Sequence, residues 1–160
     1  GIRGRIREKA LLFTLRTVYE GGQLAVMKDT YYELNERAAR SGYVDLIDVE
    51  AFREEERTSE EIRKLQSAGV HVIASFHNFD RTPDREELIR RLTRMQEMGA
   101  DVVFYGHTHC PAYHVYESEG VTVFNPGSIA LPRQMTPSGP TFLIIDLADD
   151  GRLTPELYTL

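Results

Sequence analysis

The chain of 160 residues has little cysteine, few cations near its end and no long apolar run. Its single cysteine, Cys110, cannot form an internal disulfide, which fits the reducing cytosol. No apolar stretch approaches the roughly 20 residues that a membrane helix needs, and no signal-peptide pattern opens the chain. We therefore expect a cytoplasmic protein that has no membrane partner.

The balance of charge is mildly acidic, since 19 Lys and Arg stand against 25 Asp and Glu, a formal net charge of −6. Nucleic acids need clustered cations, so we expect no nucleic-acid partner. No feature points to a specific protein partner, and monomer and homodimer both stay open. Hydrophobic residues make up 41% of the chain, which is too apolar for disorder and ordinary for a globular domain of this length.

The composition changes near residue 100. Residues 1–100 contain 17 Lys and Arg and 18 Asp and Glu, whereas residues 101–160 contain two cations, Arg133 and Arg152, and seven acids. Either two segments of different origin meet here, or one domain has a helix-rich half and a sheet-rich half. We predict one domain over 1–160, built from a 1–100 segment and a 101–160 segment.

Before residue 100, short apolar runs alternate with charged amphipathic stretches, which predicts strand–helix units in a parallel sheet. The expected strands are 10–17, 45–50, 70–75 and 101–105. The expected helices are 30–41, 58–68 and 83–98. Thr58 or Ser59 is the expected N-cap of the second helix, and Thr82 that of the third.

After residue 100, β-rich runs are broken by glycine and proline, which predicts two hairpins. The first pairs 114–117 with 121–124, and the second pairs 141–147 with 153–159. These strands would have to extend or cover the parallel sheet. We therefore expect 121–124 and 142–145 to be strongly buried.

Several strings in the first hundred residues resemble type I 3-dehydroquinate dehydratase. They are Phe13-Thr14-Leu15-Arg16-Thr17 with Glu20-Gly21-Gly22, Tyr31-Tyr32-x-Leu34-Asn35, Asp45-Leu46-Ile47-Asp48-Val49-Glu50, and Ser75-Phe76-His77-Asn78-Phe79-x-x-Thr82-Pro83. The resemblance implies an α/β fold with four parallel strands of a half TIM barrel and helices outside, continued by mixed or antiparallel strands. It also implies a lysine that forms an imine with the substrate ketone before water is eliminated.

By the same resemblance, His77 is the general acid–base, Glu20 the carboxylate that orients it, and Arg16 a cation that binds substrate. The residues are compatible with this role, because His77 follows an expected parallel strand at the end where α/β folds place their sites. An imidazole beside a carboxylate is a proton shuttle near neutral pH. The alternative is a buried polar pair that only satisfies hydrogen bonds.

The imine-forming lysine of the family corresponds to position 104, which is Phe104 in this chain. The three lysines present, Lys9, Lys28 and Lys64, are not expected at strand ends. Without an amine no imine forms, and a full barrel needs roughly 250 residues. The sequence therefore predicts that dehydratase activity is absent.

The chain from Gly99 onward resembles the carboxyl-terminal part of a calcineurin-like metallophosphoesterase of the small bacterial and archaeal phosphodiesterase type. The strings are Gly106-His107-Thr108-His109-x-Pro111, Phe124-Asn125-Pro126-Gly127-Ser128 and Leu131-Pro132-Arg133. The resemblance implies that His107 and His109 each bind one ion of a dinuclear metal centre. The other ligand motifs of that family are absent, so two histidines make only part of a site.

A mixed metal site is a further hypothesis. The carboxyl ends of the strands would bring His77, His107 and His109 toward one rim, where Glu20 or Glu50 could add an oxygen. No cofactor is expected to be required, and an adventitious Zn, Mn or Ni ion is the cofactor that this arrangement would take.

The sequence as a whole predicts an engineered or recombined chimera with a hybrid fold and no evolved activity. A residual metal-dependent phosphodiesterase is the first alternative. A 3-dehydroquinate dehydratase-type lyase is the second.

Overall fold

The computed structural model describes residues 4–5, 9–81, 83–99, 102–104, 111–116, 121–129, 139–148 and 153–160. It divides the chain into two compact units, Gly1–Val103 and Phe104–Leu160. This boundary lies close to the expected change of composition near residue 100. That the two units form one domain stays a prediction.

The first unit is built on parallel strands. They are β1 (Leu12–Thr14), β2 (Leu46–Glu50), β3 (His71–Ser75) and β4 (Val102–Phe104). β1 pairs with β2, β2 with β3, and β3 with β4, all in parallel. In this register Thr14 lies opposite Asp48, and Glu50 lies opposite Ser75. The carboxyl ends of β1, β2 and β3 therefore meet at one edge.

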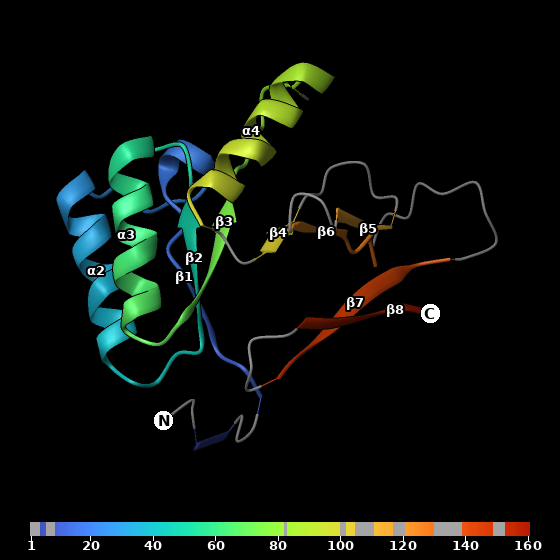
Figure 1. Cartoon of the computed structure of the whole chain (residues 1–160), viewed down its shortest axis with the longest axis horizontal. Helices are drawn as coiled ribbons and strands as arrows, with labels where there is room; N and C mark the ends of the chain where they lie inside the picture. The colour runs from blue at the N-terminus through green and yellow to red at the C-terminus, as the bar shows by residue number, and fades with distance from the viewer. Residues whose placement is uncertain are drawn as a thin grey trace. The chain divides into compact units, whose positions relative to one another are not determined.

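Helices connect the strands and cover them. They are the short 3₁₀ helix η1 (Val18–Glu20), α2 (Lys28–Arg40), α3 (Glu55–Ser67) and α4 (Arg85–Glu97). α2 and α3 lie side by side next to β1–β3, and α3 packs on α2, β2 and β3 (Figure 1). The predicted α/β class, with parallel strands and helices packed outside, is confirmed.

The core of this unit lies between the strands and the helices α2 and α3. Its fully buried apolar side chains include Tyr31 and Tyr32 on α2, Ile47 and Val49 on β2, Ile62 and Leu65 on α3, and Val72 on β3. Burying one such side chain is worth about 1.5–3 kcal/mol. The core therefore fixes the strands whose carboxyl ends carry the polar residues described below.

The helices α3 and α4 do not begin where the sequence predicted. α3 begins at Glu55, before the expected caps Thr58 and Ser59, because Thr58 is buried inside the helix and bonds to Tyr32. α4 begins at Arg85, two residues after Pro83, and its N-cap is Asp84, whose carboxylate accepts from the Glu87 N–H. The expected cap Thr82 lies outside the described residues.

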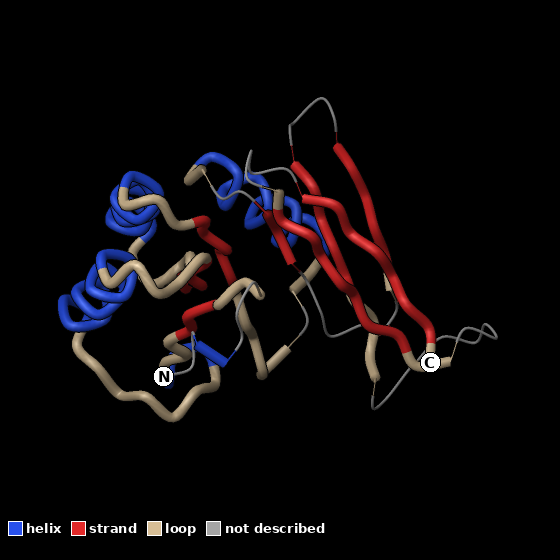
Figure 2. Tube along the Cα trace, turned by 90° about the horizontal axis from the view of Figure 1, so that it is seen from below, coloured by secondary structure: helices blue, strands red, loops and turns tan. Residues whose placement is uncertain are grey.

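The second unit contains two antiparallel pairs, as predicted. β5 (Ala112–Tyr116) pairs with β6 (Val121–Asn125), and β7 (Thr141–Leu147) pairs with β8 (Leu153–Thr159). The β7–β8 pair is the long ribbon that leads to the C-terminus in Figure 2. Phe124 is buried as expected, but the expected burial of 142–145 is wrong, since Ile144 is 45% exposed. Side chains on opposite faces of a ribbon alternate, which leaves one face of β7 open.

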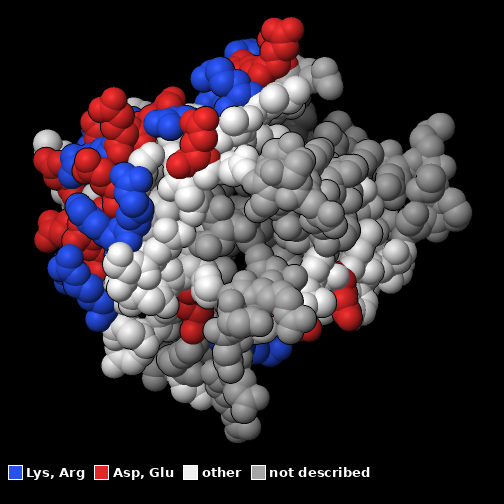
Figure 3. Space-filling view, in the orientation of Figure 1, with Lys and Arg blue, Asp and Glu red and all other residues white. Residues whose placement is uncertain are grey.

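Charged side chains of both signs are interspersed over α2 and α3 on the face shown in Figure 3. Several form ion pairs, such as Arg40 with Glu36 and Arg94 with Glu55. None of the helices that the structure describes combines the length and the apolar character that a membrane span requires.

Candidate functional site

A polar cluster occupies the carboxyl ends of three neighbouring parallel strands. Arg16 and Glu20 follow β1, Asp48 and Glu50 end β2, and Ser75 ends β3 with His77 two residues beyond it. Asp48 and Glu50 are two residues apart on one strand, so their side chains leave the same face of the sheet. The site predicted from His77, Glu20 and Arg16 is thus brought together by strand pairing.

His77 and Glu20 form a hydrogen-bonded pair. His77 Nδ1 lies 2.9 Å from Glu20 Oε2, and the backbone N–H of His77 donates to the same oxygen over 3.2 Å. The His77 side chain is 42% exposed, whereas that of Glu20 is buried. With Nδ1 donating to the carboxylate, the ring presents Nε2 as its basic nitrogen. This is the geometry of a general acid–base with an orienting carboxylate.

Burial governs the titration of Glu20. Loss of water around its carboxyl raises the pKa of Glu20 above the usual range. The hydrogen bond from His77 lowers this pKa, but its effect is smaller than that of burial. The nearby charge of Glu50 raises this pKa further, and that of Arg16 opposes the rise. Because Oε2 also accepts from Arg16 Nη1 at 2.9 Å, the His77 partner belongs to a network of charges.

Arg16 is the centre of this network. Its Nη1 donates to Glu20 Oε2 and to Ser75 Oγ, both over 2.9 Å, and its Nη2 donates to Asp48 Oδ2 over 2.5 Å. Glu50 Oε1 lies 3.7 Å from Nη1. One guanidinium therefore links residues from all three strand ends, and three carboxylates outweigh its charge. Asp48 Oδ1 is buried and has no hydrogen-bond partner in the structure.

A second carboxylate clamps the segment that carries Glu20. Glu50 Oε1 accepts from the backbone N–H of Thr17 and Glu50 Oε2 from the Thr17 hydroxyl, each over 2.7 Å. The Glu50 N–H in turn donates to the buried Tyr31 hydroxyl over 2.9 Å. Thr17 is the N-cap of η1, so this clamp fixes the turn that ends in Glu20. Charge-assisted hydrogen bonds of this kind are the strong ones in proteins.

Gly21 allows an aromatic ring to lie close to this turn. Its backbone has φ +81°, and a Cβ there would fall 2.1 Å from the Phe79 ring. The Phe79 ring lies nearly parallel to the His77 ring, with centroids 6.4 Å apart and an interplanar angle of 11°. Glycine adopts this φ without strain and leaves room for the ring.

The metal ligands predicted from the sequence, His107 and His109, lie outside the described residues. Glu50, named as a further ligand, uses both carboxylate oxygens on Thr17. Within the described part of the chain, no group of three or more His, Cys, Asp or Glu side chains could hold a metal ion. The metal hypothesis and the phosphoesterase resemblance stay predictions.

Four residues of the cluster had no role assigned from the sequence: Thr17, Tyr31, Asp48 and Ser75. All four lie in the strings that resemble the dehydratase family, and this was the signal in the sequence that could have identified them. What the sequence could not supply is the parallel register that places Ser75 beside Glu50. That register brings both within reach of Arg16.

Comparison with known proteins identifies relatives of the first unit. The family model of type I 3-dehydroquinase matches residues 1–103. The 3-dehydroquinate dehydratases of Listeria welshimeri and Syntrophotalea carbinolica are each 48% identical over 101 residues, which cover 63% of this chain and 40% of each relative. The chain thus spans about 40% of the length of the curated relatives it matches.

Solved structures agree with the sequence matches. Type I 3-dehydroquinate dehydratase from Clostridium difficile, solved with covalently modified comenic acid, is 43% identical at a TM-score of 0.62. The alignment covers 66% of this chain and 42% of that one. The enzyme from Geobacillus kaustophilus is 32% identical at a TM-score of 0.61, over 66% and 41% of the two chains. The likeness supports the half-barrel fold of the first unit.

These matches overturn one prediction. A chimera with no evolved activity was expected, but this prediction is wrong, since the relatives that are 48% identical over 101 residues are named 3-dehydroquinate dehydratase. A recombined origin is not confirmed. Through the match over residues 1–103, the chain belongs to the type I 3-dehydroquinase family.

Proposed function

We propose that the chain takes part in the dehydration of 3-dehydroquinate, with His77 as its general acid–base. The observation that carries this proposal is the bond of His77 Nδ1 to the buried Glu20 carboxylate, 2.9 Å long, at the carboxyl ends of parallel strands. α/β folds place their reaction centres at this edge. The family match covers every residue of the pair and of the network around it.

The elimination needs a group that takes a proton and returns it. His77 Nε2 removes a proton from the carbon next to the substrate ketone, and the electron pair of that C–H bond forms an enolate. When the enolate collapses, the C–O bond to the neighbouring hydroxyl breaks, and the leaving oxygen takes the proton back from His77. The products are water and a conjugated enone, so His77 ends in its starting state.

Glu20 holds the imidazole in the state that this cycle requires. Its Oε2 fixes Nδ1 as the donor, so Nε2 is the basic nitrogen, and it stabilises the imidazolium formed after proton removal. Arg16 Nη1 holds Glu20 in place through a bond of 2.9 Å, and the Ser75 hydroxyl accepts a second bond of the same length from Arg16. Asp48 Oδ1, a buried acceptor without a partner, suits a substrate hydroxyl.

The lysines that the structure describes do not enter this site. Lys28 Nζ donates to Glu54 and Lys64 Nζ to Glu36, at 2.9 and 3.4 Å. Lys9 precedes β1, at the opposite end of the strands. The role we assign to the described residues is therefore proton transfer, and imine formation forms no part of it.

The test follows turnover of 3-dehydroquinate by the 160-residue chain through the ultraviolet absorbance of the conjugated enone. His77→Gln should lower the rate at least about 100-fold, because a general acid–base contributes about 10²–10⁴. Glu20→Gln should lower the rate less, because the imidazole would lose the carboxylate that orients it and that stabilises the imidazolium.

The matched control is His71→Gln. His71 begins β3 and His77 follows it, so the two histidines lie at opposite ends of the same strand. His71→Gln should leave the rate unchanged. Equal rates for His71→Gln and His77→Gln would refute the assignment of His77, and absence of turnover by the unmodified chain would refute the proposed function itself.

A further inference from the structure

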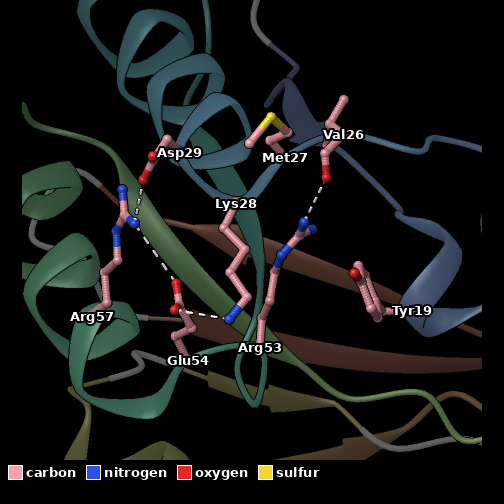
Figure 4. A pocket seen from close by; sticks show the side chains of 8 residues that line it. All are labelled: Tyr19, Val26, Met27, Lys28, Asp29, Arg53, Glu54 and Arg57. Atoms are coloured by element: carbon pink, nitrogen blue, oxygen red, sulfur yellow. Dashed lines mark hydrogen bonds and ion pairs between the residues drawn. The ribbon is translucent and has the colours of Figure 1, made fainter.

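A pocket of about 440 Å³ lies outside the cluster around Arg16, where the loops after β1 and β2 lead into α2 and α3. Figure 4 shows its lining. The residues are Tyr19, Val26, Met27, Lys28, Asp29, Arg53, Glu54 and Arg57. Three of them are cations and two are acids.

Arg53 is a buried guanidinium with unused donors. Its side chain is 3% exposed, and its Nη2 donates to the Val26 carbonyl over 2.8 Å. Its Nε and Nη1 have no hydrogen-bond partner in the structure. Glu50 Oε2, the carboxylate oxygen paired with Arg53, lies 3.7 Å from Nη1 and already accepts from Thr17. Buried hydrogen-bond donors ordinarily have an acceptor, so the two unpaired nitrogens of Arg53 need an explanation.

Two aromatic rings hold Arg53 in place. The Tyr31 ring, which is buried, and the Tyr19 ring, which is exposed, lie 4.8 and 4.9 Å from its Cζ. Tyr19, the exposed ring of the two, lies with Arg53 in the lining of the pocket. Because Tyr19 is exposed, a small rotation of its ring would open Arg53 to the pocket at little cost.

Two helix N-termini also line the pocket. Lys28 and Asp29 open α2, and Glu54 is the N-cap of α3. Neither N-cap residue, Met27 or Glu54, makes a side-chain capping bond. The first-turn N–H groups of both helices thus lack the usual capping acceptor, and each terminus adds about half a positive charge.

The remaining cations are held loosely. Lys28 Nζ donates to Glu54 over 2.9 Å and Arg57 Nη1 to Asp29 over 2.5 Å, and Glu54 Oε2 lies 3.7 Å from Arg57. The Lys28 and Arg57 side chains are 50% and 43% exposed, and ion pairs of exposed cations are worth only about 0–1 kcal/mol. Glu54 Oε2 is itself buried and has no hydrogen-bond partner in the structure. Together, the side chains and the two helix termini make the pocket electropositive.

We infer that this pocket binds a phosphate group, either free or carried by a small phosphorylated molecule. A guanidinium with free donors, an ammonium group and two uncapped helix termini approach from several directions, which suits the oxygens of a tetrahedral anion. The site is separate from His77 and does not depend on the proposed dehydration.

The test is a titration of the ¹⁵N-labelled chain with inorganic phosphate, and in parallel with glycerol 3-phosphate, at constant ionic strength. Saturable shifts should be confined to the amides of residues 28–31 and 55–58 and to the Arg53 side chain. If glycerol 3-phosphate binds more tightly than inorganic phosphate, the site is assigned to a phosphorylated molecule. If the two bind equally, the site is assigned to free phosphate.

Lys28→Gln should weaken phosphate binding at least fivefold, and Arg53→Gln should abolish it. Lys64→Gln is the matched control, because Lys28 and Lys64 are 50% and 58% exposed and each pairs with a glutamate. It should leave the affinity within twofold. If Arg53→Gln does not fold, the two lysine variants still test the proposal. Equal losses of phosphate affinity in Lys28→Gln and Lys64→Gln would overturn the site. Amide shifts spread over the whole surface of the protein would overturn it as well. His77→Gln should bind phosphate normally.

Discussion

Glu20 Oε2 accepts from three N–H groups: the His77 ring, the His77 backbone and Arg16. These bonds favour the charged carboxylate, yet burial raises its pKa overall. The sequence predicted the pair of His77 and Glu20 because family strings keep their order. It could not predict the bond of Ser75 to Arg16, since 59 residues separate them and only strand register brings them together.

Substitution of Gly21 tests how closely this turn is fitted. Gly21→Ala places a Cβ at φ +81° and 2.1 Å from the Phe79 ring, which is 76% exposed and has to turn away, so we expect a loss of about 2 kcal/mol in the free energy of unfolding. Gly42→Ala is the control, because Gly42 has φ +68° and no atom within 4 Å of its added Cβ. This substitution should lower the free energy of unfolding by about 1 kcal/mol, because only the left-handed backbone conformation disfavours alanine there. Urea denaturation gives both values.

A double substitution separates the two causes at position 21. In a Phe79→Ala background the ring is absent, so Gly21→Ala should cost no more than Gly42→Ala. If its cost stays at the higher value, the ring is not the cause, and the account of Gly21 fails.

At the scale of elements, the sequence predicted some boundaries well and others poorly. The limits of β7 and β8 match the expected 141–147 and 153–159, because polar turn residues bound both runs. The helix α3 begins at Glu55, earlier than the expected 58–68, because Thr58 does not act as its cap. Its hydroxyl bonds instead to Tyr32 on the neighbouring helix, a contact that no local pattern reveals.

The start of α4 offers a direct test of capping. The Asp84 carboxylate accepts from the Glu87 N–H over 2.8 Å, so Asp84→Ala should cost about 1 kcal/mol in stability and should fray the first turn. Asp80→Ala removes a nearby exposed acid outside the helix and should change stability little. Hydrogen exchange at the α4 amides, combined with urea denaturation, measures both effects. Equal losses in the two variants would show that Asp84 does not act as a cap.

At the scale of the whole molecule, the composition changes near residue 100, and the structure divides the chain into two units after Val103, whereas the prediction that both form one domain stays untested. The sequence did not predict that one buried carboxyl would titrate near neutral pH. Glu61 on α3 is 1% exposed, and its Oε1 has no hydrogen-bond partner in the structure. Burial raises the pKa of Glu61 to about 7, and the charge of Glu36 on α2 adds to the rise.

This carboxyl should make the stability of the protein depend on pH. Glu61 loses its proton near pH 4.5 when unfolded and near 7 when folded, so the folded state holds the extra proton in that window. The free energy of unfolding should therefore fall as pH rises from 4.5 to 7, and stay low above 7. Glu61→Gln removes this loss, so the free energy of unfolding of this variant should exceed that of the unmodified chain by about 3 kcal/mol at pH 8 and should match it below pH 4.5. Glu60→Gln, an exposed neighbour, is the control and should show a difference that does not vary with pH. Urea denaturation at several pH values measures all three proteins, and a Glu61→Gln difference that is constant across pH would show that this carboxyl titrates normally.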